Sequence, residues 1–467
     1  MMRNLILIVL DTARADGFTP YGAPGEATPA IGDLARRGIA APRVVAPSNW
    51  TLPSHASMFT GMLPGTLGLT VGTKIGSRVG LNSRPILESN SDRVIAAVLR
   101  DRGFETAAVS ANPWIHELHG FGTGFERFVS LRSNRKQSGG ALRSRMEWAL
   151  DGWRARADDG AREAKAILER WLAERDGRRF FWFVNLMECH SPYLPPMPYN
   201  DLRGVDRIRA ARDAALFQTP QGIYRVCVGE LAVGEDAWAR MRHLYACSIR
   251  QMDDWIAWLL GELDRTGILE ETLVVVASDH GENLGENGLV GHELSLDERL
   301  IRVPLVFSAP VDVPPLASLA HLPSIVAGPL ELEDHPWREE PLVRGFAVSQ
   351  VAGQVLLPER EAIARGWGVP EEAIRRIADP MSSATDGRYK LVRDGEGERL
   401  YDLDADPAES APFSPQDQGV PEGLAQSLRA AINEVDSMAP VATPEPSADL
   451  GDEKAELEER LRALGYI

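Results

Sequence analysis

Cysteine is scarce in this sequence. The 467 residues include three cysteines, and none of them forms a Cys-x-x-Cys pair with another. The count excludes a disulfide framework, and the spacing offers no thiolate metal site of the usual kind. Few cysteines in an odd number are typical of a reducing compartment, so we expect a cytoplasmic protein. The three are Cys189, Cys227 and Cys247.

Long apolar runs are also missing. The run nearest the N-terminus, Leu5–Leu10, ends at the charged residue Asp11. It is shorter than the roughly 7–15 residues of a signal-peptide core and far shorter than the roughly 18 residues of a membrane span. We therefore expect no membrane partner and interpret the run as a buried parallel strand.

An excess of positive charge is absent as well. The chain has 50 Lys and Arg against 67 Asp and Glu, which gives a formal net charge of −17. An acidic field repels nucleic acids and anionic membranes, so neither is expected as a partner. A site for a small anionic ligand in such a chain needs a local source of positive charge, such as a bound metal or several histidines.

Apolar β-type runs alternate with helical patterns along most of the chain. Such an alternation predicts βαβ units, and the fold class is therefore α/β with a large, mostly parallel sheet sandwiched by helices. Helices are predicted at Pro29–Gly38 and Arg93–Arg102, and strands at Leu5–Leu10, Thr106–Ser110, Phe180–Leu186, Leu273–Ser278 and Val303–Phe307.

The pattern changes after about residue 345. Arg388–Val392 and Arg399–Leu403 flank the turn-like Asp394–Gly397, which predicts a β-hairpin within a small antiparallel sheet. We expect a catalytic α/β domain at 1–345, a C-terminal α+β subdomain at 346–412 and a helical tail at 413–467.

Two further segments carry helical patterns. Arg143–Arg175 predicts a long helix whose charges form a solvated face. Pro440–Pro446 predicts an extended linker that leads into an amphipathic helix at Glu453–Leu464. This last helix either packs against its own chain, which is favoured, or forms a dimer contact. The sequence gives no other indication of an oligomer.

Polar residues follow four of the predicted strands. Asp11 follows the first strand, Asn112 the second, His190 the third, and Asp279 with His280 the fourth. In a parallel sheet, ligands bind beyond the carboxyl ends of the strands. We therefore expect these side chains to lie together and to form a site.

The most informative segment is Thr51–Gly61, which begins Thr-Leu-Pro-Ser-His. Pro53 in a first turn is typical of a helix start, so Thr51 can be read as a capping residue. A helix N-terminus also binds anions, and a threonine at that position would face the ligand. The two interpretations do not exclude each other.

Adjacent Asp279 and His280 at a strand end, followed by the backbone freedom of Gly281, are typical of metal ligands. Asp11 ends a buried strand, where a carboxylate is costly unless a cation or backbone donors satisfy it. Carboxylates combined with imidazole suit Zn²⁺ or Mn²⁺ better than Ca²⁺.

Together these segments resemble the sulfatase-like branch of the alkaline phosphatase superfamily. The resemblance covers the chain nearly end to end, with the motifs in the family's order. It implies the family's α/β fold, a divalent metal and a small anionic ester as substrate. The matching segments are Leu7–Asp16, Thr51–Gly61, His190–Tyr193, Asp279–Glu282, Ile301–Leu305, Gly387–Lys390, Leu400–Leu403, Asp406-Pro407 and Leu464–Ile467.

Departures from the family pattern bear on the reaction. Thr51 stands where sulfate-ester hydrolases carry a cysteine or serine that becomes formylglycine, and threonine cannot form that aldehyde. His55 replaces the arginine of the modification motif, and Thr12 replaces the second of two aspartates in the first metal loop. His280 stands where asparagine is usual, which again points away from calcium.

The resemblance also implies residue roles. One metal ion is favoured because the matched residues complete one site, although Glu188 with His190 or His292 could supply a second. The implied metal ligands are Asp11, Thr51, Asp279 and His280; the residues that stabilise substrate charge are His55, His190 and His292; and Thr12 and Asn112 are expected to contact substrate.

The function predicted from these residues is hydrolysis of a phosphodiester, phosphonate ester or phosphomonoester through a covalent phosphothreonine at Thr51. A sulfate ester of Thr51 would lack the hemiacetal exit that formylglycine provides, so phosphorus is favoured over sulfur. Two alternatives stay open. One is a soluble phospho- or sulfo-group transferase acting on a small metabolite, and the other is an anion-binding protein without catalysis.

Overall fold

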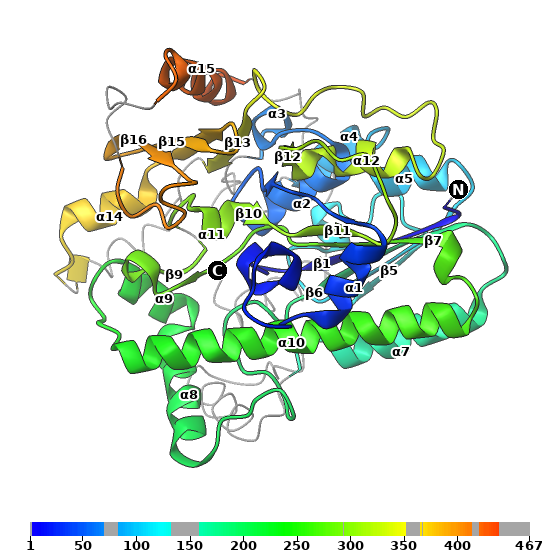
Figure 1. Ribbon diagram of the computed structural model, residues 1–467, viewed down its shortest axis with the longest axis horizontal. Coiled ribbons are helices and arrows are strands. Elements are labelled where there is room, and N and C mark those ends of the chain that lie inside the picture. Colours follow the sequence, from blue (N-terminus) through cyan, green and yellow to red (C-terminus); the bar gives the residue numbers. More distant parts are fainter. Residues whose placement is uncertain are drawn as a thin grey trace.

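In a computed structural model of the protein, a seven-stranded sheet forms the centre and helices cover both of its faces (Figure 1). The five strands from β7 to β5 run parallel, which confirms the predicted α/β class with a mostly parallel sheet. In spatial order the strands are β2 (Ile39–Ala40), β11 (Leu305–Phe307), β7 (Thr272–Ala277), β1 (Asn4–Leu10), β6 (Phe180–Leu186), β4 (Glu105–Ser110) and β5 (Arg127–Ser130).

The structure describes most of the chain but not all of it, and some predicted segments fall outside. The predicted linker 440–446 and the predicted helix Glu453–Leu464 lie outside the described residues. So does the part of the predicted helix Arg143–Arg175 that precedes residue 158. The described residues are 2–69, 83–131, 158–292, 294–351, 365–366, 368–412 and 420–438.

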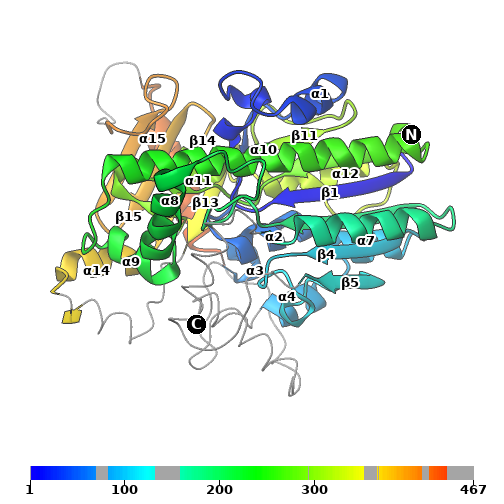
Figure 2. The ribbon, with the colours of Figure 1, turned by 90° about the horizontal axis from the view of Figure 1, so that it is seen from below.

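Alternate residues of β1 face two separate hydrophobic clusters, as expected for a strand that is buried on both sides. Figure 2 shows α10 and α7 lying along one face of the sheet. On that face, Ile6, Ile8 and Leu10 pack with α1 (Pro29–Arg37), α7 (Ala161–Glu174) and α10 (Glu235–Arg265). On the other face, Leu5, Leu7 and Val9 pack with α2 (Thr51–Thr60), α5 (Ile95–Arg100) and α12 (Leu322–Ala327).

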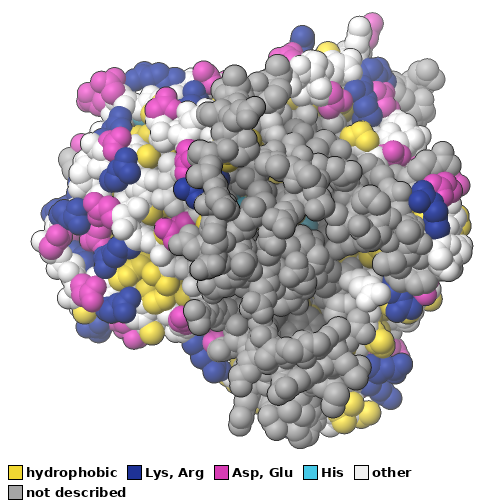
Figure 3. All heavy atoms as spheres, turned by 180° about the vertical axis from the view of Figure 1, so that it is seen from behind, with side chains coloured by type: hydrophobic (Ala, Val, Ile, Leu, Met, Phe, Trp, Pro, Cys, Tyr) yellow, Lys and Arg dark blue, Asp and Glu magenta, His cyan; other side chains and the backbone are white. Residues whose placement is uncertain are grey.

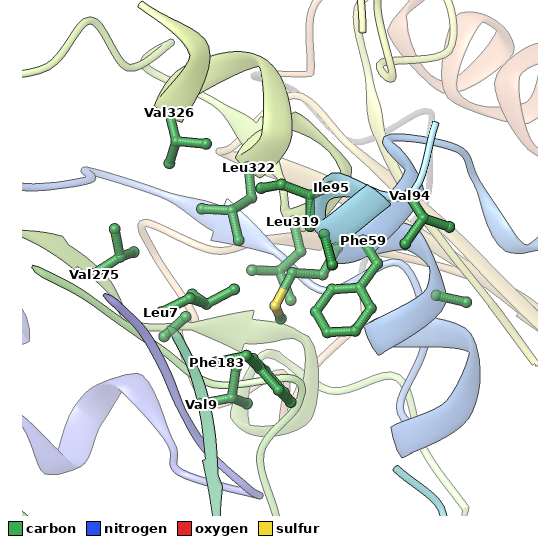
Figure 4. Packing of buried hydrophobic residues seen from close by; sticks show 14 of the residues in the cluster. Leu7, Val9, Phe59, Val94, Ile95, Phe183, Val275, Leu319, Leu322 and Val326 are labelled. Atoms are coloured by element: carbon green, nitrogen blue, oxygen red, sulfur yellow. The ribbon is translucent and has the colours of Figure 1, made fainter. Parts of the chain in front are cut away.

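Helix α2 is anchored to the sheet by Phe59 (Figure 4). The ring of Phe59 meets the ring of Phe183 on β6 edge to face, with 4.9 Å between centroids, and both side chains are fully buried. Such a pair contributes about 0.5–1.5 kcal/mol beyond the area it buries. The contact fixes the start of α2, about two turns earlier, relative to the sheet.

Pro304 divides the predicted strand Val303–Phe307. Before it, β10 (Arg302–Val303) pairs with β3 (Val44–Val45) in a separate three-stranded sheet. After it, β11 joins the central sheet antiparallel to β7. Proline has no N–H to continue a ladder, so the prediction of one continuous strand is wrong.

A four-stranded antiparallel sheet follows the central one, which confirms the predicted C-terminal sheet and its hairpin. Helix α15 (Leu424–Asp436) packs Leu428 and Ile432 against it. The limits of the three predicted domains stay predictions. The strands are β13 (Ala347–Val351), β14 (Met381–Thr385), β15 (Tyr389–Asp394) and β16 (Gly397–Asp402).

The surface carries charges of both signs. On the face opposite that of Figure 1, the described Lys and Arg side chains are interspersed with Asp and Glu (Figure 3). Mixed charge of this kind favours solubility. Among the helices that the structure describes, none combines the length and hydrophobicity needed to cross a membrane.

Candidate active site

Thr51 is the first residue of α2, and its hydroxyl faces a histidine. The residue before it, Trp50, has extended backbone angles and occupies the N-cap position. Thr51 is therefore not the cap, and the interpretation of its side chain as a capping group is wrong. Its Oγ1 lies 3.3 Å from Nε2 of His280, in a position where only 2% of the residue is exposed.

Two carboxylates lie beyond neighbouring strands at the same edge of the sheet. Asp11 follows β1 and Asp279 comes two residues after β7, and both are fully buried. Within the described chain, Oδ1 of Asp11 and Oδ2 of Asp279 accept no hydrogen bond. Burial raises the pKa of each carboxyl to about 6, and the charge of Asp279 contributes to the shift of Asp11. Two buried carboxylates with unpaired oxygens favour a cation between them.

His280 completes this arrangement with a defined tautomer. Its Nδ1 lies 3.0 Å from the carbonyl oxygen of Gly281, which can only accept a hydrogen bond, so Nδ1 carries the hydrogen. Nε2 then offers its lone pair toward Thr51 and lies 3.4 Å from Oδ2 of Asp279. Burial lowers the pKa of His280 to about 4, which keeps the imidazole neutral.

These residues fit a divalent metal. One ligand atom each from Asp11, Asp279 and His280 lies within 4.8 Å of the other two. Neutral imidazole with two carboxylates is a donor set for Zn²⁺ or Mn²⁺. The carbonyl that orients His280 supplies the hydrogen bond that metal-bound histidines commonly make through their second nitrogen.

His55 lies one turn inside α2 and has neighbours at both ring nitrogens. Nδ1 donates to the carbonyl oxygen of Thr51 at 3.0 Å, and Nε2 lies 3.4 Å from the side-chain amide of Asn185. The rings of Phe59, Phe121 and Phe183 surround it edge to face. Burial lowers its pKa to about 3, so this histidine is neutral and fixes the first turn of α2. Its contact with substrate charge stays a prediction.

His190 and His292 extend the cluster of imidazoles. The ring of His292 lies 4.5 Å from that of His280 and 5.4 Å from that of His190, measured between centroids. Nδ1 of His190 donates to the carbonyl oxygen of Ser191 at 2.8 Å. The structure thus brings both predicted histidines to the edge of the candidate metal site.

Glu282 is a member of this cluster to which the sequence assigned no role. Its Oε1 lies 3.4 Å from Nδ1 of His292. Burial opposes ionisation of Glu282, but the hydrogen bond and charge of His292, together with the charge of His190, outweigh it and lower the pKa to about 2. The Asp-His-Gly-Glu segment contains Glu282, so a sequence signal was present.

Thr12 and Asn112, expected to contact substrate, both contact the carboxylates. Thr12 has the left-handed φ of 57°, and its N–H donates to Oδ1 of Asp279 at 3.2 Å. Its hydroxyl donates to the carbonyl oxygen of Cys189 at 2.7 Å. The side-chain amide of Asn112 donates to Oδ2 of Asp11 at 2.6 Å. Each therefore positions a metal-ligand candidate, and direct contact with substrate stays a prediction.

Glu188, suggested for a second ion, faces away toward α7. Its Oε1 accepts from the N–H of Ala161 at 2.7 Å, at the start of that helix. Burial, with the charges of Asp159 and Asp158, raises its pKa to about 8. A neutral carboxylic acid that bonds to a helix start is a poor metal ligand, so Glu188 is not expected to hold a second ion. The number of ions stays a prediction.

Helix α10 contributes a residue that the sequence did not indicate. The hydroxyl of Tyr245 donates to the carbonyl oxygen of Thr12 at 2.9 Å and accepts from the N–H of Arg14 at 2.7 Å. This pair of hydrogen bonds ties the loop after β1 to the middle of the longest described helix. A single tyrosine in a helical pattern carries no sequence signal for such a contact.

Comparison with known proteins places this site in a family. The family model described as Sulfatase matches residues 3–324, which include all the site residues above. Choline-sulfatase of Rhizobium meliloti (strain 1021) is 31% identical over 186 residues, or 38% of this chain and 34% of that protein. The multifunctional alkaline phosphatase superfamily protein PehA of Trinickia caryophylli is 29% identical over 153 residues, or 29% of this chain and 30% of that protein.

These matches span about a third of the length of each curated relative. The structural likeness is more extensive. The crystal structure of a phosphonate monoester hydrolase of Agrobacterium radiobacter superposes with a TM-score of 0.63 at 19% identity, over 92% of this chain and 96% of that one. Because the family model covers more than half of the sequence, the chain belongs to the sulfatase family of the alkaline phosphatase superfamily.

Proposed function

We propose that this protein is a metal-dependent hydrolase of small phosphate esters, with Thr51 as its nucleophile. One observation carries the proposal: the Thr51 hydroxyl, at the start of α2, faces Nε2 of His280 beside Asp11 and Asp279, each of which keeps one carboxylate oxygen without a hydrogen bond from the described chain. A sulfatase-family chain with an oxygen nucleophile at this position is equipped to attack an anionic ester.

The proposed ligands are Asp11, Asp279, His280 and the Thr51 oxygen, with Zn²⁺ or Mn²⁺ as the ion. A divalent metal held there would lower the pKa of the Thr51 hydroxyl and add positive charge to an acidic protein. It would also pair the carboxylate oxygens that accept no hydrogen bond from the described chain.

In the proposed reaction, Thr51 Oγ1 loses its proton to solvent and forms a bond to phosphorus, while the bond from phosphorus to the leaving oxygen breaks and that oxygen takes up a proton from solvent. The result is a phosphothreonine, which water attacks at phosphorus in a second step to return the hydroxyl. The first N–H groups of α2 and the imidazoles of His190 and His292 would stabilise charge on the non-reacting oxygens. His55 and Asn185 would hold the first turn of α2 in place.

Two arguments favour phosphorus over sulfur. Threonine carries a methyl group on Cβ and cannot be oxidised to the aldehyde that sulfate-ester hydrolases use. His55, in place of the arginine of the modification motif, is neutral and enclosed by three phenylalanine rings. The names of the relatives include both a sulfatase and a phosphonate monoester hydrolase, so the choice has to be tested directly.

The test is hydrolysis of four matched p-nitrophenyl esters: phosphate monoester, phosphate diester, phenylphosphonate and sulfate. Protein freed of metal would be given Zn²⁺, Mn²⁺ or Ca²⁺ separately, with Thr51→Ala as the control. We expect turnover of a phosphorus ester with Zn²⁺ or Mn²⁺ and none by the variant. Dominant sulfate-ester turnover would overturn the argument from threonine, and silence on all four esters would favour a selective transferase.

A further inference from the structure

We infer that the protein has a second metal site, for Zn²⁺, formed by Asp201, His243 and Cys247. His243 and Cys247 are four residues apart on α10 and therefore lie on one face of that helix. Asp201 comes from the segment that precedes α8 (Gly204–Phe217). One ligand atom from each of the three lies within 4.8 Å of the other two. None of the three belongs to the candidate active site.

The donor atoms have spacings close to those of a zinc site. Sγ of Cys247 lies 3.7 Å from Nε2 of His243. Tetrahedral zinc with ordinary Zn–S and Zn–N bonds separates these two atoms by about 3.6 Å. Oδ1 of Asp201 lies 2.5 Å from the same Nε2, as a hydrogen bond. A zinc ion would take the place of the proton in that bond, and the carboxylate would move outward by about 1 Å.

The exposure of the three side chains suits the entry of an ion. Cys247 is buried, whereas the side chains of His243 and Asp201 are 39% and 55% exposed. The sulfur therefore lies at the base of the site, and the two ligands nearer solvent can adjust. Three protein ligands with solvent on one side leave the fourth zinc position for water.

A cysteine nucleophile with a histidine base is the competing interpretation of these residues. In such a relay, the sulfur and the carboxylate contact opposite nitrogens of the imidazole. Here both Cys247 and Asp201 contact Nε2 of His243. The three donor atoms converge on one region, which is the arrangement that a cation needs and a proton relay does not.

Arg250 already places a positive charge beside the donor atoms of this site. Its Nη2 donates to Sγ of Cys247 at 3.1 Å and lies 3.7 Å from Oδ2 of Asp201. The donor atoms thus attract a cation, and Arg250 would compete with zinc for these atoms. The Arg250 side chain is 44% exposed, so it can turn toward solvent when the ion binds.

An ion at this site would fasten two segments that lead to the active site. Asp201 ends the stretch that begins with His190 after β6. Tyr245, between His243 and Cys247 on α10, contacts the loop of Thr12 through its hydroxyl. The ring of Tyr245 also meets that of Tyr193 edge to face at 5.1 Å. A metal ion at the second site would therefore link α10 to the segment that begins with His190, and its role would be structural.

Cobalt is the probe that tests this inference. Co²⁺ added to metal-free protein should give the near-ultraviolet absorption of a thiolate–cobalt bond. The candidate active site cannot give this band, because its ligands contain no sulfur. Cys247→Ser should abolish the band, and Asp201→Asn, a change at an exposed side chain, should weaken Co²⁺ binding by more than about tenfold. Cys227→Ser, at a cysteine away from the site, should leave it unchanged.

Arg250→Gln provides a test with the opposite sign. Loss of the competing guanidinium should tighten Co²⁺ binding at the second site by about tenfold, as followed by the same band. Absence of the band in the wild-type protein, or its persistence in Cys247→Ser, would overturn the inference. The absorption band does not depend on turnover, so the second metal site is tested independently of the proposed hydrolase activity.

Discussion

Buried acids in two regions of this protein are neutralised in different ways. In the C-terminal region, the fully buried Lys390 on β15 lies 2.7 Å from Glu409 and 3.4 Å from Glu298. Arg43 also pairs with Glu298, at 2.6 Å. At the edge of the central sheet, no Lys or Arg of the described residues forms an ion pair with Asp11 or Asp279. The ion-pair partners of Asp279 are the imidazoles of His55 and His280.

This difference distinguishes a buried acid cluster that stabilises the fold from one that indicates a ligand site. A buried cluster whose cation is itself fully buried, as Lys390 is, is complete and can only hold the fold together. A cluster of acids with neutral imidazole is incomplete until a cation arrives, and it therefore indicates a ligand. Glu188 is a third case, because burial raises its pKa to about 8 and a proton neutralises it. The predictions below follow from these three ways of neutralising a buried carboxylate.

The largest effect is expected at Thr51. Thr51→Ala should lower turnover of the best phosphorus ester by at least about 10⁴-fold, because it removes the proposed nucleophile. Thr51→Ser keeps an oxygen and should retain measurable turnover. Steady-state kinetics at saturating metal, with circular dichroism as a check on folding, measures both. Near-wild-type activity of the alanine variant would exclude Thr51 as nucleophile.

Asp279→Asn should abolish metal binding and turnover without destabilising the metal-free protein. The amide keeps the oxygen that accepts from Thr12 and His280, and it removes an unpaired buried charge. Metal content by atomic spectroscopy and the unfolding midpoint of the metal-free protein in urea are the two measurements. Strong destabilisation of the metal-free variant would mean that Asp279 is a structural carboxylate.

Lys390→Met should have the opposite signature. Lys390 is the only Lys or Arg of the described residues that forms an ion pair with Glu409. Its removal leaves a buried charge, and the free energy of unfolding should fall by about 3–5 kcal/mol. Metal affinity of the variant that remains folded should stay close to that of the wild type. Urea unfolding with and without metal separates the two effects. A variant as stable as the wild type would contradict the structural role.

Glu188→Gln should change the pH dependence of stability. The pKa of Glu188 is about 8 in the folded protein against an ordinary value of 4.5, so the folded state holds the extra proton between these values. The stabilisation that this proton gives the folded state is complete below the ordinary pKa of 4.5. It is lost as the pH rises through the folded-state pKa of about 8. The wild type should lose a few kcal/mol of stability between about pH 5 and pH 9 through this group, and Glu188→Gln should not. Equal slopes for both proteins would contradict this assignment.

The sequence predicts the fold well, and the structure brings together the polar residues that follow the strands, for a physical reason. Apolar runs such as Phe180–Leu186 are buried on both faces, and polar residues that follow parallel strands meet at one edge. Asp11, Asp279 and His280 are predictable from this rule alone. The break at Pro304 was also readable, because proline cannot continue a ladder.

What the sequence does not reveal depends on contacts between distant segments. Tyr245 meets the Thr12 loop 233 positions away, and nothing in either segment indicates the pairing. Whether Thr51 caps α2 depends on the backbone angles of Trp50, which the motif leaves open. The convergence of Asp201 on His243 likewise joins a loop to a helix 42 positions later.

The most direct test of the central claim is to trap the covalent intermediate on Thr51. Metal-loaded protein would be mixed with the best phosphorus ester, quenched in acid within one turnover and digested for mass spectrometry. A phosphoryl group on the peptide that contains Thr51, absent without metal and absent from the alanine variant, is the predicted result. Turnover of the same ester with no adduct at Thr51 and undiminished activity of the alanine variant would contradict it.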